Sequence, residues 1–137
     1  MDIPSLANGR TALRLDGDQI VWLTSTRRDG RPHAVPVWFD WDGRAVTIFT
    51  EPDTQKVRKI RHDGRVLLTL DDTNGGGEVD IFEGEATLLD QPAAEVVRPE
   101  YLAKYRQHIP YLELTEDEML AKYHQPIRVV LTRFMGW

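Results

Sequence analysis

The stretch PHAVPVWFDWDGRAVTIFTEPDTQKVRKIR, residues 32–61, determines the fold that we expect for this chain. Residues 33–41 alternate between two faces, which is typical of a β-strand, and Asp42-Gly43 is a strong signal for a tight turn. Residues 45–50 then form the returning strand, and a short basic helix follows with Asp53 as its expected N-cap. Two strands therefore lead the chain to the N-terminus of a helix.

The N-terminus of that helix is suited to binding a phosphate. Its unpaired N–H groups and partial positive charge attract anions. Thr50 and Thr54 add hydroxyl groups there, and Lys56 adds a full positive charge. The combination predicts a phosphorylated cofactor, whereas the basic residues of an isolated helix would be interpreted only as a solvated face.

Most of the remaining chain is expected to form β-strands. They are predicted at residues 19–26, 65–71, 78–90 and 126–134, the third of them with a kink at Gly84. Pro36 lacks an N–H group, so its strand is expected at an edge of the sheet or bulged there.

Helices are predicted to begin near Pro99 and at a capping box that starts with Thr115. Trp22 and Trp41 are expected in the core. The pattern as a whole predicts an α+β, mainly β architecture, in which six largely antiparallel strands form a barrel with inserted helices.

The composition limits the function. A length of 137 residues fits one domain, and a net charge of -5 argues against general nucleic-acid binding. The absence of cysteine excludes disulfides, thiolate metal ligands and cysteine nucleophiles. No apolar run has membrane-spanning length, and the first fifteen residues do not resemble a signal peptide, so we expect a cytoplasmic protein.

No motif identifies a catalytic side chain. The four histidines, His33, His62, His108 and His124, show no metal-ligand spacing, so no metal site is expected. The chain has neither a paired acid and base nor a nucleophile motif, and the catalytic residues stay unknown. This absence is consistent with a reaction that a bound cofactor carries.

Three segments carry a resemblance to a known family: DGRPHAVPVWFDWDG at 29–43, IFTEPDTQKVRKIRHDGRV at 48–66 and FEGEATLL at 82–89. Their order and spacing resemble the pyridoxamine 5'-phosphate oxidase-like superfamily, and more closely its actinobacterial branch of coenzyme F420-dependent enzymes. The resemblance covers nearly the whole chain. It implies one split-barrel domain over residues 1–137, a homodimer, and a flavin or deazaflavin in a groove between the subunits.

The resemblance also assigns cofactor-binding residues. It places the ring system against the strand residues Val35, Pro36, Val37 and Trp38, and the cofactor phosphate among Thr50, Thr54, Gln55 and Lys56. Trp38 has an alternative place at the dimer interface. His33 and Trp137 are candidates for the substrate pocket, although Trp137 is also suited to simple packing.

The function that the resemblance implies is an F420-dependent reductase, which passes a hydride from the reduced deazaflavin to a small unsaturated acceptor. The alternatives are an FMN-binding oxidoreductase of the same fold and a non-catalytic carrier of the flavin or deazaflavin. Oxidation of pyridoxamine phosphate is not expected, because the extra basic and C-terminal residues that hold its phosphate in relatives have no counterpart here.

Overall fold

The computed structural model describes residues 9–70 and 75–136 of the chain. Its first half contains α1 (Arg10–Gly17), β1 (Val21–Thr26), β2 (Pro32–Val37), β3 (Asp40–Trp41), β4 (Ala45–Thr50), α2 (Gln55–His62) and β5 (Arg65–Leu70). Its second half contains β6 (Asp80–Leu88), α3 (Ala93–Val96), α4 (Pro99–Tyr105), the 3-10 helix η2 (Ile109–Leu112), α5 (Glu116–Lys122) and β7 (Gln125–Gly136).

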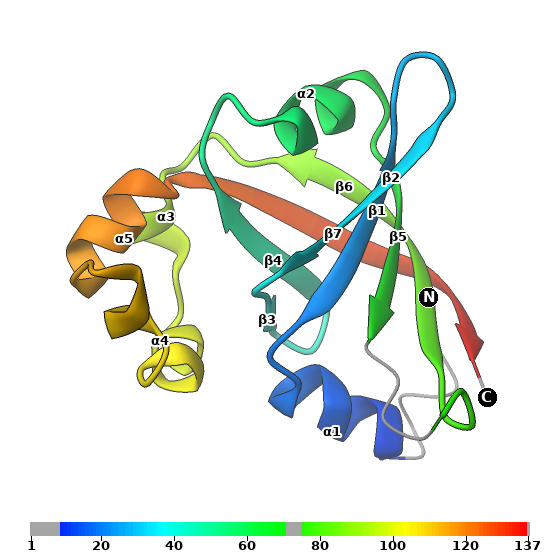
Figure 1. Cartoon of the computed structure of the whole chain (residues 1–137), viewed down its shortest axis with the longest axis horizontal. Coiled ribbons are helices and arrows are strands. Elements are labelled where there is room, and N and C mark those ends of the chain that lie inside the picture. Colours follow the sequence, from blue (N-terminus) through cyan, green and yellow to red (C-terminus); the bar gives the residue numbers. More distant parts are fainter. Residues whose placement is uncertain (1–8, 71–74, 137) are drawn as a thin grey trace.

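The strands form one antiparallel sheet in the order β2-β1-β5-β6-β7-β4-β3. The sheet is strongly twisted, and its strands cross at steep angles (Figure 1). It holds the main core, which includes Leu23, Ile48, Leu68, Phe82 and Ile127, all at most 1% exposed. The split-barrel architecture is confirmed, with seven strands instead of the six expected.

The helices lie in three places around this sheet. Helix α2 lies at one end and α1 at the opposite end, while α3, α4 and α5 gather beside β4 (Figure 1). The last three helices build a second core cluster around Tyr101, Tyr105 and Met119. No helix of the described ranges is long and apolar enough to cross a membrane.

The prediction of one continuous strand over residues 33–41 is wrong in one respect, because the strand is broken at Trp38. β2 ends at Val37 and pairs only with β1, whereas the two-residue β3 pairs with β4 at the other edge of the sheet. The cause is a contact from far along the chain: the Phe39 backbone N–H donates to the Tyr105 hydroxyl at 2.9 Å. This break accounts for the extra strand.

Several local predictions are confirmed. Pro36 lies on the edge strand β2, and a register shift between β6 and β7 occurs at Glu83/Gly84. A Cβ atom at Gly84 would approach Val129 Cγ1 to 2.6 Å, so this position requires glycine. The capping box at Thr115 is present, and α4 begins with Pro99.

Two local predictions are wrong. Thr54, and not Asp53, is the N-cap of α2. Trp22 is 37% exposed, because it points to the outer face of β1 while its neighbours Val21 and Leu23 point into the core. Trp41 is half-buried against the main core, as expected. Helix α1 was not predicted.

Candidate functional site

A cavity of about 330 Å³ lies between the sheet and the helices that flank β4. Its lining comes from the start of β1, the end of β2, β4, α2, α4, η2 and α5: Ile20, Pro36, Val37, Trp38, Phe49, Thr50, Lys56, Tyr101, Leu112, Met119, Leu120 and Tyr123. Of the described residues in this lining, Lys56 alone carries a charge. The cavity is therefore an apolar, aromatic space with one cationic side, as is common for sites that bind small molecules.

Stacked aromatic rings form one wall of the cavity. The Trp38 ring stacks on Tyr105 with centroids 4.4 Å apart and planes within 4°. Tyr101 lies 5.0 Å from Tyr105 and 5.0 Å from Phe49, so the four rings form a continuous series. Contacts of this kind hold the rings in fixed orientations.

A single hydroxyl group fixes this wall to the sheet. The Tyr105 hydroxyl accepts from the Phe39 N–H and lies 2.7 Å from the Gln19 carbonyl oxygen, to which it donates. Tyr105 itself is completely buried. The turn after β2 that presents Trp38 to the cavity is thus fixed by a residue of α4.

The polar side of the cavity lies at the start of α2. Lys56 is half-buried, and this burial lowers the pKa of its ammonium, although Glu51 acts in the opposite direction. The Thr50 hydroxyl lies 3.5 Å from that of Thr54. The Thr54 side chain makes no capping hydrogen bond, so the first backbone N–H groups of α2 are left without this partner. The cation, the two hydroxyl groups and the helix N-terminus together favour the binding of an anion.

The structure brings together five of the residues predicted to bind a cofactor: Pro36, Val37, Trp38, Thr50 and Lys56 all line the cavity. The remaining three are not part of the lining. Val35 packs against the main core, Thr54 contacts Thr50, and Gln55 lines a separate depression on the other side of α2. Trp137 lies outside the described residues.

The sequence prediction missed the helical wall of the cavity. Tyr101, Leu112 and Tyr123 belong to segments far from the stretch that suggested the site. Their only sequence signal is an aromatic and apolar pattern, which equally fits a packed helix face. The way the helices pack on the sheet decides which of these side chains reach the cavity.

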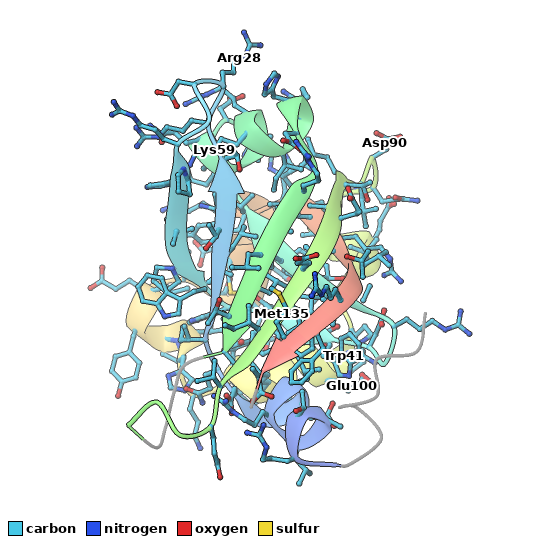
Figure 2. All side chains as sticks on the ribbon, turned by 90° about the vertical axis from the view of Figure 1, so that its right-hand side faces the viewer. Arg28, Trp41, Lys59, Asp90, Glu100 and Met135 are labelled. Atoms are coloured by element: carbon cyan, nitrogen blue, oxygen red, sulfur yellow. The ribbon has the colours of Figure 1, made fainter. Side chains whose placement is uncertain are left out.

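Basic side chains surround the second depression. The depression is lined by Arg27, Arg28, Gln55, Arg58, Lys59 and His62, and a neighbouring one adds Arg61. We call Arg27, Arg28, Arg58, Lys59, Arg61 and His62 the basic patch. Arg28 and Lys59 lie at the same end of the sheet, next to α2 (Figure 2).

His33, the predicted substrate residue, contacts this patch and not the cavity. Its Nδ1 lies 2.6 Å from Lys59 Nζ, so a neutral imidazole accepts a hydrogen bond from the ammonium. The Lys59 charge lowers the pKa of His33, and burial, Arg27 and Lys56 lower it further. The pKa of Lys59 is also lowered, mainly by burial and then by Arg27 and Lys56.

The lowered pKa of His33 makes stability depend on pH. As the pH falls through about 6.5, the unfolded chain binds a proton on His33 more readily than the folded chain does, so folding becomes less favourable. We expect the wild-type melting temperature to fall between pH 7.5 and 5.5, and the fall to be smaller in His33→Gln. Thermal melts at the two pH values measure this, with exposed His124 changed to Gln as the control. Equal falls in all three proteins would contradict it.

Metal binding finds no support in the described residues. Within residues 9–70 and 75–136, no three side chains of His, Asp or Glu come together closely enough to hold an ion.

Comparison with known proteins agrees with this architecture. A solved F420 reductase superposes with a TM-score of 0.73 at 24% sequence identity, over 93% of this chain and 96% of that one. A conserved hypothetical protein from Mycobacterium tuberculosis has a TM-score of 0.73 at 24% identity, over 100% of this chain and 84% of the other. An FAD-binding protein from Mesorhizobium loti has a TM-score of 0.68 at 17% identity, over 95% of this chain and 90% of the other. At these identities the neighbours show the fold.

The family follows from the sequence itself. No curated protein sequence matches the chain significantly. The family model described as pyridoxamine 5'-phosphate oxidase matches residues 10–134, which is nearly the whole chain and includes every lining residue of the cavity. The chain therefore belongs to the pyridoxamine 5'-phosphate oxidase family.

Proposed function

We propose that this protein is an oxidoreductase that binds coenzyme F420, an 8-hydroxy-5-deazaflavin, in the aromatic cavity and uses it to reduce a small unsaturated acceptor. The observation that carries the proposal is the division of the cavity into an aromatic part and a cationic side. A flavin-type cofactor has the same division, with a flat ring at one end and a ribityl phosphate at the other.

The residues present fit such a group. Pro36, Val37 and Trp38 would lie beside the ring, and β2 is an edge strand, so part of its backbone hydrogen-bonding capacity is free to meet ring atoms. Thr50 and Lys56 would hold the phosphate, with the N-terminus of α2 behind them and Thr54 and Gln55 next to it. A bound phosphate would keep the Lys56 ammonium charged despite its burial.

When bound, the deazaflavin supplies the hydride. The side chains of this protein would bind and orient the cofactor and the acceptor, and they would exclude water from them. The Trp38–Tyr105 stack fixes the wall against which a flat ring can rest, and Leu112, Met119 and Leu120 add apolar lining that limits the access of water. Transfer of the hydride leaves the acceptor with a negative charge that one proton must neutralise. Solvent at the open side of the cavity can supply this proton, so the scheme agrees with the lack of a catalytic motif.

A homodimer is part of the proposal. β2 is an edge strand, and Tyr111 (86% exposed) and Leu112 (37% exposed) present apolar surface next to the cavity. Edges and apolar patches of this kind favour covering by another surface. A second subunit that lies over this region would close the cavity toward solvent, and a cytoplasmic location would give the cofactor and acceptor access to it.

The alternatives within the proposal are FMN as the cofactor and a carrier that binds without turnover. The fold neighbours support a flavin-type cofactor, since they include both an F420 reductase and an FAD-binding protein.

A turnover experiment distinguishes an enzyme from a carrier. The protein is mixed with reduced F420 and either a quinone or an α,β-unsaturated ketone, and the return of oxidised F420 absorbance is followed. We expect oxidation above the protein-free rate, and binding without any such oxidation would favour the carrier.

A further inference from the structure

The hydroxyl group of Tyr101 is a buried polar group without a partner in the described part of the protein. Tyr101 is only 3% exposed, and its side chain lines the cavity. Its ring contacts Phe49 and Tyr105, with centroids 5.0 Å away in both cases. Within residues 9–70 and 75–136, its hydroxyl forms no hydrogen bond. Buried hydroxyl groups normally have a partner, so this one requires an explanation.

Tyr105, one turn later on α4, shows the usual arrangement. Its hydroxyl accepts from the backbone N–H of Phe39 at 2.9 Å and donates to the carbonyl oxygen of Gln19 at 2.7 Å. The two tyrosines lie on the same face of the helix, since they are four residues apart. The Tyr105 hydroxyl therefore serves the fold, whereas the Tyr101 hydroxyl bonds no group among the described residues.

The cavity is the place from which a partner for the Tyr101 hydroxyl can come. The side chains that line the cavity are mostly apolar or aromatic, and a molecule bound among them would have few other groups with which to form hydrogen bonds. Burial raises the pKa of the Tyr101 hydroxyl, and the neighbouring Tyr105 and Asp40 raise it further, so the group keeps its proton. A protonated hydroxyl in an apolar space is suited to donate a hydrogen bond to an oxygen atom of a bound molecule.

We propose that the Tyr101 hydroxyl donates a hydrogen bond to the carbonyl oxygen of the acceptor, so that the protein reduces carbon–carbon double bonds conjugated to a carbonyl group. The inference rests on the proposed function, because it needs the hydride donor in the same cavity. The cofactor ring is proposed beside Pro36, Val37 and Trp38, and the Tyr105 ring stands between Trp38 and Tyr101 in the series of stacked rings. The Tyr101 hydroxyl thus belongs to the part of the cavity that is left for the acceptor.

The hydrogen bond acts on the charge that develops during the reaction. The β-carbon of the acceptor receives the hydride, the electrons of the double bond shift toward the carbonyl group, and its oxygen becomes that of an enolate. The α-carbon then takes a proton from solvent, which gives the saturated carbonyl compound and completes a two-electron reduction of the acceptor. Tyr101 keeps its proton throughout and stabilises the negative oxygen, as donors at a developing oxyanion do.

The test is Tyr101→Phe, which removes the hydroxyl and keeps the ring. With reduced F420 and cyclohex-2-enone, kcat/KM should fall about 100-fold, while the dissociation constant of F420 stays the same. The infrared C=O stretch of the enone, bound beside oxidised F420, should lie at a lower frequency in the wild type than in Tyr101→Phe, because a hydrogen bond weakens the C=O bond.

Stability provides an independent check that needs no cofactor. Tyr101→Phe should melt no earlier than the wild type, because its hydroxyl has no partner among the described residues. Tyr105→Phe is the matched control: it removes a hydroxyl from the same helix that bonds Phe39 and Gln19, so it should melt earlier.

Three results would overturn the inference and leave the proposed function standing. Equal kcat/KM in the wild type and Tyr101→Phe would show that the hydroxyl does not act on the acceptor. Weaker F420 binding with unchanged turnover of the bound complex would place the hydrogen bond on the cofactor ring. A melting temperature lowered as much as in Tyr105→Phe would show that the hydroxyl is bound within the protein. If the wild type reduces no acceptor at all, the proposed function itself fails and the inference fails with it.

Discussion

Lys56→Ala should lower the affinity for the cofactor by about tenfold or more while leaving the fold intact. A charge-assisted contact with a phosphate is worth about 1.5–3 kcal/mol, and Lys56 is the charged residue in the described lining of the cavity. Its side chain is only half-buried, so its removal leaves no large void in the core. Calorimetric titration of the folded variant measures the affinity, and its melting temperature checks the fold.

Lys122→Ala is the matched control for this change. Lys122 is an exposed lysine at the end of α5. It forms a long ion pair of 3.9 Å with Glu51, and its ammonium lies 5.4 Å from the ring centroid of the cavity residue Tyr123. Its removal subtracts the same charge from the same neighbourhood without touching the proposed phosphate site. Equal loss of affinity in both variants would mean that general electrostatic attraction, and not a specific site, binds the cofactor.

Asp80→Ala should destabilise the protein by about 3 kcal/mol or more, because it removes the buried carboxylate that holds α1 on β6. Asp80 is 0% exposed. It accepts hydrogen bonds from Thr11 at 2.7 Å, Arg14 at 2.8 Å and Arg10 at 3.2 Å. Without it, the Thr11 hydroxyl and the Arg14 guanidinium, both largely buried, lose a partner that alanine cannot replace. Urea denaturation measures the free energy of unfolding.

Glu78→Ala is the control for this second prediction. Glu78 pairs with the same Arg10, but at 3.9 Å and with a side chain that is 47% exposed, so its removal should cost about 1 kcal/mol or less. Helix α1 lies at the end of the sheet opposite α2 (Figure 1), so cofactor affinity should be unchanged in both variants once they are folded. An Asp80→Ala protein as stable as Glu78→Ala would show that the buried cluster contributes little to stability.

The features that the sequence predicted well are those that depend on a few neighbouring residues. The capping box at Thr115 needs only Glu118 three residues later, and the bulge at Gly84 follows from the missing side chain. Pro36 cannot donate to a strand on its outer side, so it lies on an edge strand. Each of these has a local physical cause.

The features that failed depend on contacts from far along the chain. Alternation continued from residue 33 to 41, yet the strand breaks at Trp38 because the Tyr105 side chain, 66 residues from Phe39, binds the backbone there and stacks on the Trp38 ring. The exposed Trp22 shows that alternation identifies two faces without showing which one faces the core.

In the candidate site, too, the features with a local cause were predicted and those that depend on distant contacts were not. Its strand side and its cation, Pro36, Val37, Trp38, Thr50 and Lys56, come from one continuous segment and were predicted together. The helical wall and the basic patch could not be predicted, because they depend on how α4, η2 and α5 pack on β4 and on how the β1–β2 turn meets α2. The placement of His33 on the patch has the same origin.

The central claim is that the aromatic cavity binds a flavin-type cofactor, and calorimetric titration of F420 and FMN into cavity variants tests it most directly. Leu112→Trp places a larger ring at the cavity, whereas Leu13→Trp makes the same change on α1, at a residue that is 73% exposed and outside the lining. We predict that F420 binds the wild type and Leu13→Trp equally. It should bind Leu112→Trp about tenfold more weakly or worse, because the indole would occupy part of the cavity, and fitting the cofactor against it would cost about 1–3 kcal/mol. Failure of both cofactors to bind the wild type, or equal binding of F420 to all three proteins, would contradict the account.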